Sequence, residues 1–246
     1  MPPSFPYGGM ENPRLTFLTP TLLAGDRSLV NVVAHELAHS WTGNLVTNST
    51  AEHFWLNEGF TVFAERRILE ALEGESMAAL HAAVGFQGLL DAFEQHSKHP
   101  ELTKLRTHLD GVDPDDAFSL VPYEKGFLFL KTLEAAAGRS AFDRLLTRWL
   151  SAHRFGSVTT DDFLGMVEKE LPGLLAKVNA SAWVDGPGLP KDHWRPSSER
   201  LEAVRTVGAR VPSVDETKRW GVIEWQLFLD AFPRPARAGI CEQLEA

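Results

Sequence analysis

The stretch His35-Glu36-Leu37-Ala38-His39, followed by Glu58, decides how this chain is interpreted. Residues four apart lie on the same face of a helix, so His35 and His39 can direct two imidazoles to one ion. Glu58 would complete a set of two histidines and one glutamate, the catalytic type of zinc site, which leaves one position open. Glu36 is turned about 100° from His35 on the helix, where a base can take a proton from a water molecule that the ion activates.

The match is more specific than a five-residue pattern alone. In a chain of 246 residues with 9 histidines, chance gives such a pattern about 0.03 times, and requiring Glu58 as well lowers the figure to about 0.002. The alternative is a buried helix that carries two hydrogen-bonded core histidines and no metal.

The composition is that of a soluble globular protein. Hydrophobic residues make up 43% and charged residues 23% of the chain, whose length suits one large or two small domains. A net charge of −9 and the absence of a basic run argue against nucleic acid or an anionic membrane as a partner. Cys241 is the only cysteine, the N-terminus lacks a secretory signal, and no apolar run reaches about 20 residues. These features favour a cytoplasmic protein.

The hydrophobic periodicity predicts a helix-rich chain with a short extended start. Tyr7–Asn12 and Leu15–Leu18 have the pattern of extended segments. A helix capped by Asp26 or Ser28 is expected to carry the histidine pair and to end at Gly43-Asn44. Further helices are expected at His53 to Gly74, Ser76 to Gln95, Tyr123 to Ala137, Ser140 to His153, from Thr159 or Thr160 onward, Leu174 to Val184, Glu199 to Ala209 and Asp215 to Ala231. A Gly- and Pro-rich linker predicts a boundary near residue 186.

Several motifs, in order along the chain, resemble one enzyme family. They are Pro6-Tyr7-Gly8-Gly9-Met10-Glu11-Asn12-Pro13, His35-Glu36-Leu37-Ala38-His39-Ser40-Trp41-Thr42-Gly43-Asn44, Trp55-Leu56-Asn57-Glu58-Gly59, Val121-Pro122-Tyr123-Glu124-Lys125-Gly126, Thr159-Thr160-Asp161-Asp162 and Pro187-Gly188-Leu189-Pro190. Together they resemble the zinc aminopeptidases of the gluzincin clan, most of all the leukotriene A(4) hydrolase/aminopeptidase branch.

The resemblance covers roughly Pro2 to Pro190 and implies a mainly α (α+β) fold. Residues 1–186 would form a thermolysin-like zinc-peptidase catalytic domain with a short N-terminal β segment. Residues 187–246 would form a linker and the start of a truncated helical C-terminal domain.

The resemblance also implies catalytic roles. One Zn²⁺ per chain would be held by His35, His39 and Glu58, with Glu36 as general base. Tyr123 matches the position of a tyrosine hydroxyl that stabilises the oxyanion, a donor typically worth about 2.7–4 kcal/mol in the transition state. A capping or packing tyrosine near a helix start is the alternative for Tyr123.

The segment Gly8-Gly9-Met10-Glu11 is implied to bind the substrate. It would run as an edge strand along the cleft, where glycines allow the backbone of a peptide to approach. The carboxylate of Glu11 would pair with a free α-ammonium group, which restricts substrates to short peptides with a free N-terminus. A surface glutamate on a strand is the alternative for Glu11.

Three further side chains are candidates for bracing the ligands. Glu65 follows Glu58 by two helical turns and could accept a hydrogen bond from a ligating histidine, with a solvated glutamate as the alternative. Asn44 and Asn57 could brace the loops that carry the ligands.

Two departures from the family pattern bear on function. Asp115 matches an aspartate thought to guide water to a lipid epoxide in the animal enzymes, but Phe118 stands where those enzymes are expected to have a tyrosine. This favours peptidase activity only. Family members also carry a β-rich domain before the Gly-Gly-Met-Glu-Asn strand and a helical domain after the zinc domain, so strands able to pair with Tyr7–Glu11 and Leu15–Leu18 are expected to be missing.

Three functions remain open at this stage. The first is a zinc aminopeptidase. The second is a zinc-binding, catalytically weak fragment that acts through association, since self-association would cover apolar surface and unpaired strand edges. The third is a broader zinc hydrolase of esters or epoxides.

Overall fold

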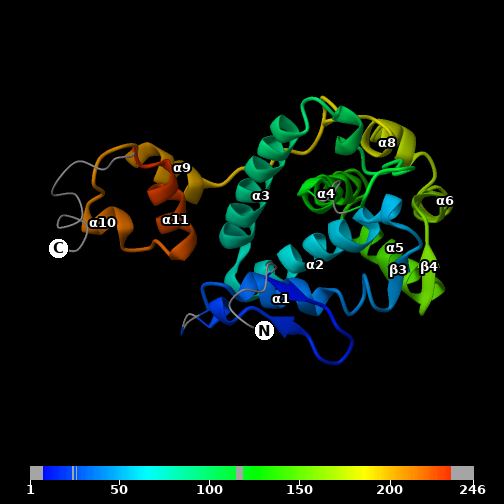
Figure 1. Cartoon of the computed structure of the whole chain (residues 1–246), viewed down its shortest axis with the longest axis horizontal. Helices are drawn as coiled ribbons and strands as arrows, with labels where there is room; N and C mark the ends of the chain where they lie inside the picture. Colours follow the sequence, from blue (N-terminus) through cyan, green and yellow to red (C-terminus); the bar gives the residue numbers. More distant parts are fainter. Residues whose placement is uncertain (1–7, 24, 26, 115–118, 234–246) are drawn as a thin grey trace.

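A computed structural model describes residues 8–23, 25, 27–114 and 119–233. Figure 1 shows a large helical body and, at the left, a smaller group of C-terminal helices joined to it by an extended segment. The prediction of a mainly helical fold with short strands is confirmed. No helix in the described part of the chain combines the length and the apolar character needed to cross a membrane.

The helix that carries the first histidine, α1 (Val30–Ala38), is shorter than expected. It ends at Ala38 with His39 as its C-cap, and the chain then turns back through Gly43, whose φ is +124°. Because a positive φ costs little only for glycine, Gly43 allows this turn rather than ending the helix itself. No side-chain cap forms at the first turn, where Leu29 is the N-cap.

The central helix, α2 (Trp55–Glu73), follows the short 3₁₀ turn η2 (Ala51–His53) and ends, as predicted, at Gly74. It is buried along most of its length and contacts α1, α3 (Glu75–Gln95), α4 (Gly126–Ala137) and the π-helical turn η4 (Val121–Lys125). This position makes α2 the common scaffold for α1 and η4, the two elements that flank the histidine pair and Tyr123.

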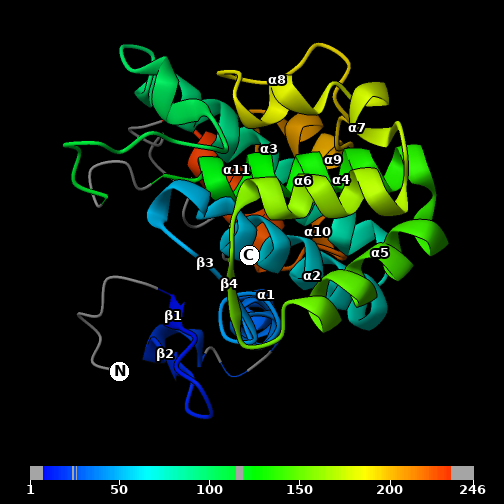
Figure 2. The ribbon, with the colours of Figure 1, turned by 90° about the vertical axis from the view of Figure 1, so that its right-hand side faces the viewer.

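Two small sheets flank the helices. Strands β1 (Gly9–Met10) and β2 (Phe17–Leu18) pair antiparallel with each other, so each extended segment has a partner in the other. Strands β3 (Val46–Asn48) and β4 (Gly156–Val158) pair in parallel, with Val46 opposite Gly156, and were not predicted. Figure 2 shows β1 and β2 beside α1, which places the glycine-rich segment next to the histidine helix.

The remaining body helices surround an aromatic core. They are α5 (Arg139–Ala152), α6 (Thr160–Glu170), α7 (Leu174–Lys177) and α8 (Ala180–Val184). Thr159 caps α6 in a capping box with Asp162, as its predicted position suggested. The helix expected to begin at Ser140 begins one residue earlier, because Gly138 is the N-cap of α5 and Ser140 lies inside the helix. The single helix expected over residues 174–184 is broken at Asn179, whose left-handed φ of 51° interrupts the backbone ladder.

The C-terminal helices have a small core of their own. Helices α9 (Glu199–Val207), α10 (Val214–Thr217) and α11 (Val222–Ala231) replace the two that were expected. Val204, Val207 and Phe228 form a separate buried cluster, whereas Leu201 packs on α3. The boundary near residue 186 stays a prediction.

Candidate metal and active site

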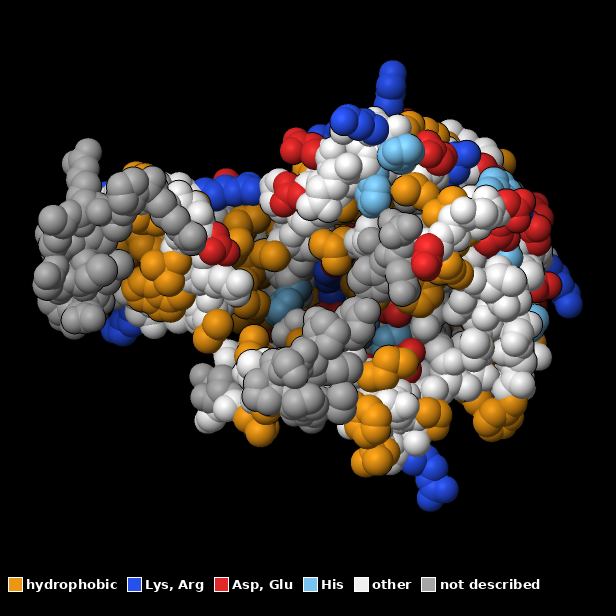
Figure 3. Space-filling view, in the orientation of Figure 1, with side chains coloured by type: hydrophobic (Ala, Val, Ile, Leu, Met, Phe, Trp, Pro, Cys, Tyr) orange, Lys and Arg blue, Asp and Glu red, His pale blue; other side chains and the backbone are white. Residues whose placement is uncertain are grey.

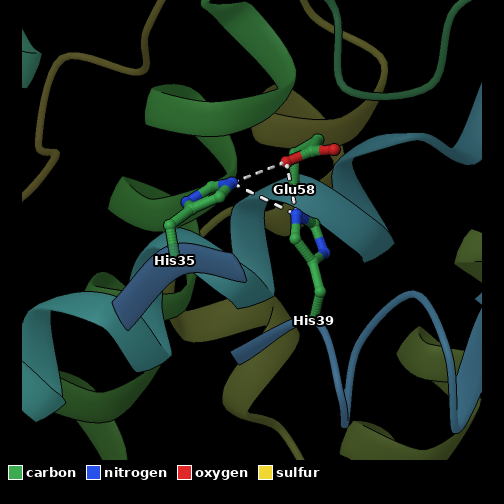
Figure 4. A group of neighbouring side chains, drawn as sticks. All are labelled: His35, His39 and Glu58. Carbon is green, nitrogen blue, oxygen red and sulfur yellow. Dashed lines mark hydrogen bonds and ion pairs between the residues drawn. The ribbon is translucent and has the colours of Figure 1, made fainter. Parts of the chain in front are cut away.

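The three predicted metal ligands converge on one point, as Figure 4 shows. His35 Nε2 lies 3.3 Å and His39 Nε2 lies 3.6 Å from Glu58 Oε2, and the two Nε2 atoms are 3.2 Å apart. The histidines come from α1 and its C-cap, and Glu58 comes from the first turn of α2. The packing of these two helices therefore brings together ligands that are separated in the sequence.

The donor set fits a tetrahedral zinc ion. Ligands about 2.0–2.1 Å from such an ion lie about 3.3 Å from one another, which is close to the three observed separations. Glu58 Oε2 is buried and accepts no well-aligned hydrogen bond, although it lies within ion-pair distance of both rings. A carboxylate oxygen buried in this way requires a positive partner, which a divalent cation would provide.

The outer nitrogens of both histidines are held by oxygen atoms. His39 Nδ1 lies 2.9 Å from both the carbonyl oxygen of Thr42 and Oδ1 of Asn57. Since a carbonyl oxygen can only accept, the proton of His39 resides on Nδ1 and the lone pair of Nε2 faces Glu58. His35 Nδ1 lies 3.0 Å from Oε2 of Glu65. Both rings are thus held in the orientation that a metal ligand needs.

The charge around His35 is that of a cation site. Burial lowers the pKa of His35, but the close contact with Glu58, the hydrogen bond to Glu65 and the charges of both carboxylates outweigh it and raise the pKa to about 10. Two carboxylates facing one imidazole attract either a proton or a metal ion.

Glu36 lies beside the ligand set and is buried. Its carboxylate belongs to a second group of potential ligand atoms, with Glu11 and His39, that all lie within 4.8 Å of one another. Burial raises the pKa of Glu36, although the nearby histidines oppose this effect. A carboxylate with a raised pKa, close to the point where the ligands meet, is suited to proton transfer.

Gly9 makes the room that Glu36 occupies. A Cβ atom at Gly9 would lie 2.4 Å from Oε1 of Glu36, whereas one at Gly8 would lie 3.3 Å from its nearest neighbour, Val32. The sequence suggested that these glycines admit the substrate backbone. The structure adds a steric reason for Gly9 within the protein itself.

Tyr123 lies in η4, beside the ligand His35. Its ring is roughly parallel to that of His35 with 6.1 Å between centroids, and it contacts Phe54 edge-on at the same distance. Burial raises the pKa of Tyr123, and the charges of Glu58 and Glu11 act in the same direction. The hydroxyl therefore keeps its proton and can act as a hydrogen-bond donor.

Glu11 directly follows β1, and its carboxylate lies near that of Glu36 and the ring of His39. Its Oε1 atom is 3.9 Å from His39 Nδ1, and its backbone oxygen accepts a hydrogen bond of 2.8 Å from Nδ2 of Asn44. Met10 is half-exposed on the outer side of β1. The structure thus brings Gly9 and Glu11 to the ligand set, while Asp115 and Phe118 lie outside the described residues.

Sequence reasoning missed two features of the site. Gly59, next to Glu58, meets Gly126 so closely that a Cβ at Gly59 would lie 2.7 Å from the Gly126 Cα. Arg66 and Glu124 form a buried ion pair one residue beyond Glu65 and Tyr123. The glycines stood in the recognised motifs, but the approach of two helices cannot be read from either motif alone.

The fold and the ligand set together define a zinc-peptidase type of catalytic domain. Residues 1–183 match the family model described as the peptidase family M1 domain. The chain belongs to peptidase family M1. This agrees with the resemblance stated from the motifs.

Known relatives extend the comparison. The chain is 48% identical over 196 residues to leucine aminopeptidase 2 of Emericella nidulans, an alignment that covers 77% of this chain and 32% of the relative. It is 47% identical to a leukotriene A-4 hydrolase homolog of Botryotinia fuckeliana, covering 77% of this chain and 30% of the relative. The chain therefore spans about a third of the length of these curated relatives.

Solved structures share the fold. The native leukotriene A4 hydrolase from Saccharomyces cerevisiae superposes with a TM-score of 0.85 at 37% identity, covering 96% of this chain and 41% of that chain. An M1 zinc metallopeptidase from Deinococcus radiodurans gives a TM-score of 0.58 at 27% identity, covering 78% of this chain and 39% of that chain.

Proposed function

We propose that this chain is the catalytic part of a zinc aminopeptidase that removes the N-terminal residue of short peptides. The observation that carries the proposal is the meeting of His35 Nε2, His39 Nε2 and Glu58 Oε2 within 3.2–3.6 Å, with the buried carboxylate of Glu36 beside them. Relatives named as aminopeptidases support the same class of reaction.

Each residue then has a defined task. A zinc ion held by His35, His39 and Glu58 would polarise the scissile carbonyl and lower the pKa of a water molecule toward neutrality. Glu36 accepts the proton of the attacking water and passes it to the leaving amine. Tyr123 donates a hydrogen bond to the carbonyl oxygen as that oxygen gains negative charge.

Substrate selection falls to the glycine-rich segment. The carboxylate of Glu11 pairs with the α-ammonium group of the peptide, and the Gly8–Met10 backbone offers an edge along which the peptide lies. Asn44 holds the backbone of Glu11 through its side-chain amide. A peptide with a blocked N-terminus would leave the Glu11 carboxylate unpaired and is therefore a poor substrate.

Hydrolysis of an aminoacyl-anilide tests this function. We expect turnover that a chelator abolishes, that Glu36→Gln lowers by about 10²–10⁴-fold at unchanged zinc content, and that is absent with an N-blocked anilide. Tyr123→Phe is expected to lower kcat by about 10²–10³-fold without loss of zinc. Equal turnover of the blocked and free anilides would refute the role of Glu11.

A second candidate, a zinc-binding chain that acts through association, is favoured by one observation. Val33, Leu37 and Trp41 are between 44% and 54% exposed and, spaced by four residues, form an apolar stripe along α1 and the turn after it. Native mass and metal content, measured together, separate the two functions. An oligomer that binds zinc but does not hydrolyse any anilide would favour the second.

A further inference from the structure

We infer that the buried ion pair between Arg66 and Glu124 positions Tyr123 beside the metal ligands. The inference rests on the function proposed above, because that function requires the Tyr123 hydroxyl to lie at a defined position near the metal ligands. Arg66 and Glu124 are positioning residues, since neither belongs to the ligand set.

The pair is rigid and tightly enclosed. Arg66 Nη1 and Nη2 donate to Oε2 and Oε1 of Glu124 at 2.9 and 2.7 Å, a two-bond geometry that fixes the direction of the carboxylate as well as its distance. Arg66 Nη2 also donates to the carbonyl oxygen of His81 at 3.3 Å, and its guanidinium lies 4.2 Å from the ring centre of Phe127. A Cβ at Gly85 would lie 2.4 Å from the Glu124 carboxylate, so α3 closes the remaining side.

The turn that carries Tyr123 has an unusual backbone. Residues Val121–Lys125 form a π-helical turn, a conformation that occurs mostly as single turns and often at functional sites. The two residues after Tyr123 are both buried, ionisable side chains held by long-range contacts. Glu124 is held by Arg66, and the Lys125 ammonium group donates to two backbone carbonyl groups at 2.8 Å each. Tyr123 is thus the middle residue of a turn whose next two residues are anchored by these contacts.

Helix α2 connects this anchor to the metal ligands. Glu65 bonds to His35, and the next residue, Arg66, bonds to Glu124. Consecutive helical side chains point about 100° apart, so one helix can reach α1 with the first residue and η4 with the second. The close approach of Gly59 in α2 to Gly126, the residue that follows η4, and to the backbone oxygen of Pro122 within η4 sets the distance between α2 and this turn. The position of Tyr123 relative to His35 is thus fixed from α2.

If the Arg66–Glu124 pair only stabilised the fold, its loss should affect activity no more than the loss of another ion pair of α2. If the pair positions Tyr123, its loss should lower kcat specifically. The chain offers a control in the ion pair of Arg67 and Glu134, which also joins α2 to a neighbouring helix, at 3.1 Å. Arg67 also pairs with the half-exposed Asp143 at 2.9 Å, and among the ion pairs of the described residues neither member of this pair is joined to η4. Methionine at both positions of either pair removes both charges and keeps side chains of similar length, which avoids an unpaired buried charge.

The first experiment compares Arg66→Met/Glu124→Met with Arg67→Met/Glu134→Met. We expect the first double variant to lower kcat for the aminoacyl-anilide by about tenfold or more, with KM and zinc content within about twofold of the parent chain. The control is expected to stay within about twofold in all three. In a Tyr123→Phe background, the first pair is expected to cause no further loss of kcat, because its effect passes through the hydroxyl. An equal loss in the control, or a further loss in that background, would overturn the inference.

The second experiment does not depend on activity. The chain has two tyrosines, so fluorotyrosine labelling gives two fluorine resonances, and Tyr7→Phe identifies that of Tyr123. We expect this resonance to broaden or split in Arg66→Met/Glu124→Met and to stay single in the control. An unchanged single resonance would overturn the inference even if the parent chain hydrolyses nothing, which separates this failure from failure of the proposed function.

One conservative variant covers the case in which the double variant does not fold. Arg66→Lys keeps the charge but loses the two-bond geometry. We expect it to lower kcat by about tenfold and to broaden the Tyr123 resonance. Activity and a resonance identical to those of the parent would refute the positioning role.

Discussion

Replacing Gly9 by alanine places a methyl carbon where the carboxylate of Glu36 lies. The added Cβ would be 2.4 Å from Oε1, 2.5 Å from Cδ and 2.6 Å from Cγ of Glu36. Ordinary contacts begin near 3.5 Å, so the carboxylate must move by about 1 Å or β1 must shift away from α1. A misplacement of about 1 Å in a catalytic group costs about 10²-fold in rate, or about 2.7 kcal/mol of barrier.

The matched control is the neighbouring glycine. A Cβ at Gly8 would lie 3.3 Å from Val32, a contact that a shift of a few tenths of an ångström relieves. Both substitutions change the flexibility of the unfolded chain equally, so their difference reports the contact with Glu36. We expect kcat/KM for a free-amine anilide to fall about 10²-fold in Gly9→Ala and less than about threefold in Gly8→Ala, at equal zinc content. Full activity in Gly9→Ala, or an equal fall in both, would refute the reasoning.

Three further predictions concern zinc and stability. Glu65→Gln removes a carboxylate from His35 Nδ1 and should weaken zinc binding by about 10–100-fold; competition with a chromophoric chelator measures this, and unchanged affinity would contradict it. Zinc affinity should rise with pH up to about 10, because the His35 pKa of about 10 means that zinc must displace a proton below that pH; a flat profile in the same competition would oppose this. Gly59→Ala should lower the free energy of unfolding by about 1–3 kcal/mol, since its Cβ meets the Gly126 backbone. Gly165→Ala in α6 is the control, because its Cβ meets nothing within 4 Å, and it should raise the free energy of unfolding by about 0.5–1 kcal/mol. Urea unfolding measures both.

Helices with strong local signals were predictable, and features set by distant contacts were not. The end of α2 at Gly74 and the Thr159 cap of α6 follow from local backbone chemistry, and both are as expected. Strands β3 and β4 are three residues each and are far apart in the sequence. Nothing within such short segments specifies a partner, so the parallel pair forms only when the helices have packed.

In the functional site, too, the arrangement of residues within one helix was predictable, whereas contacts between elements were not. Helical spacing alone places His35 and His39 on one face, so the sequence predicts that they meet. The contact of Glu65 with His35 was expected only beside the alternative of a solvated glutamate, and Asn57 was expected to brace a ligand loop rather than to contact His39, because both contacts also need the crossing of α1 and α2. The contact of Gly9 with Glu36 was not foreseen, since nothing in either motif states how β1 lies on α1.

The packing indicates that zinc binding is more resistant to destabilisation of the chain than binding of the substrate amine is. The metal ligands and their supporting oxygens come from α1, the turn after it and α2, and α2 is buried among several helices. The amine anchor Glu11 follows β1, a two-residue strand that, within the described ranges, pairs with β2 and contacts α1. Local opening is easiest where few buried contacts hold a segment. Destabilising the chain should therefore raise KM for free-amine substrates before it weakens zinc binding, because the β1 segment loosens before the crossing of α1 and α2 does.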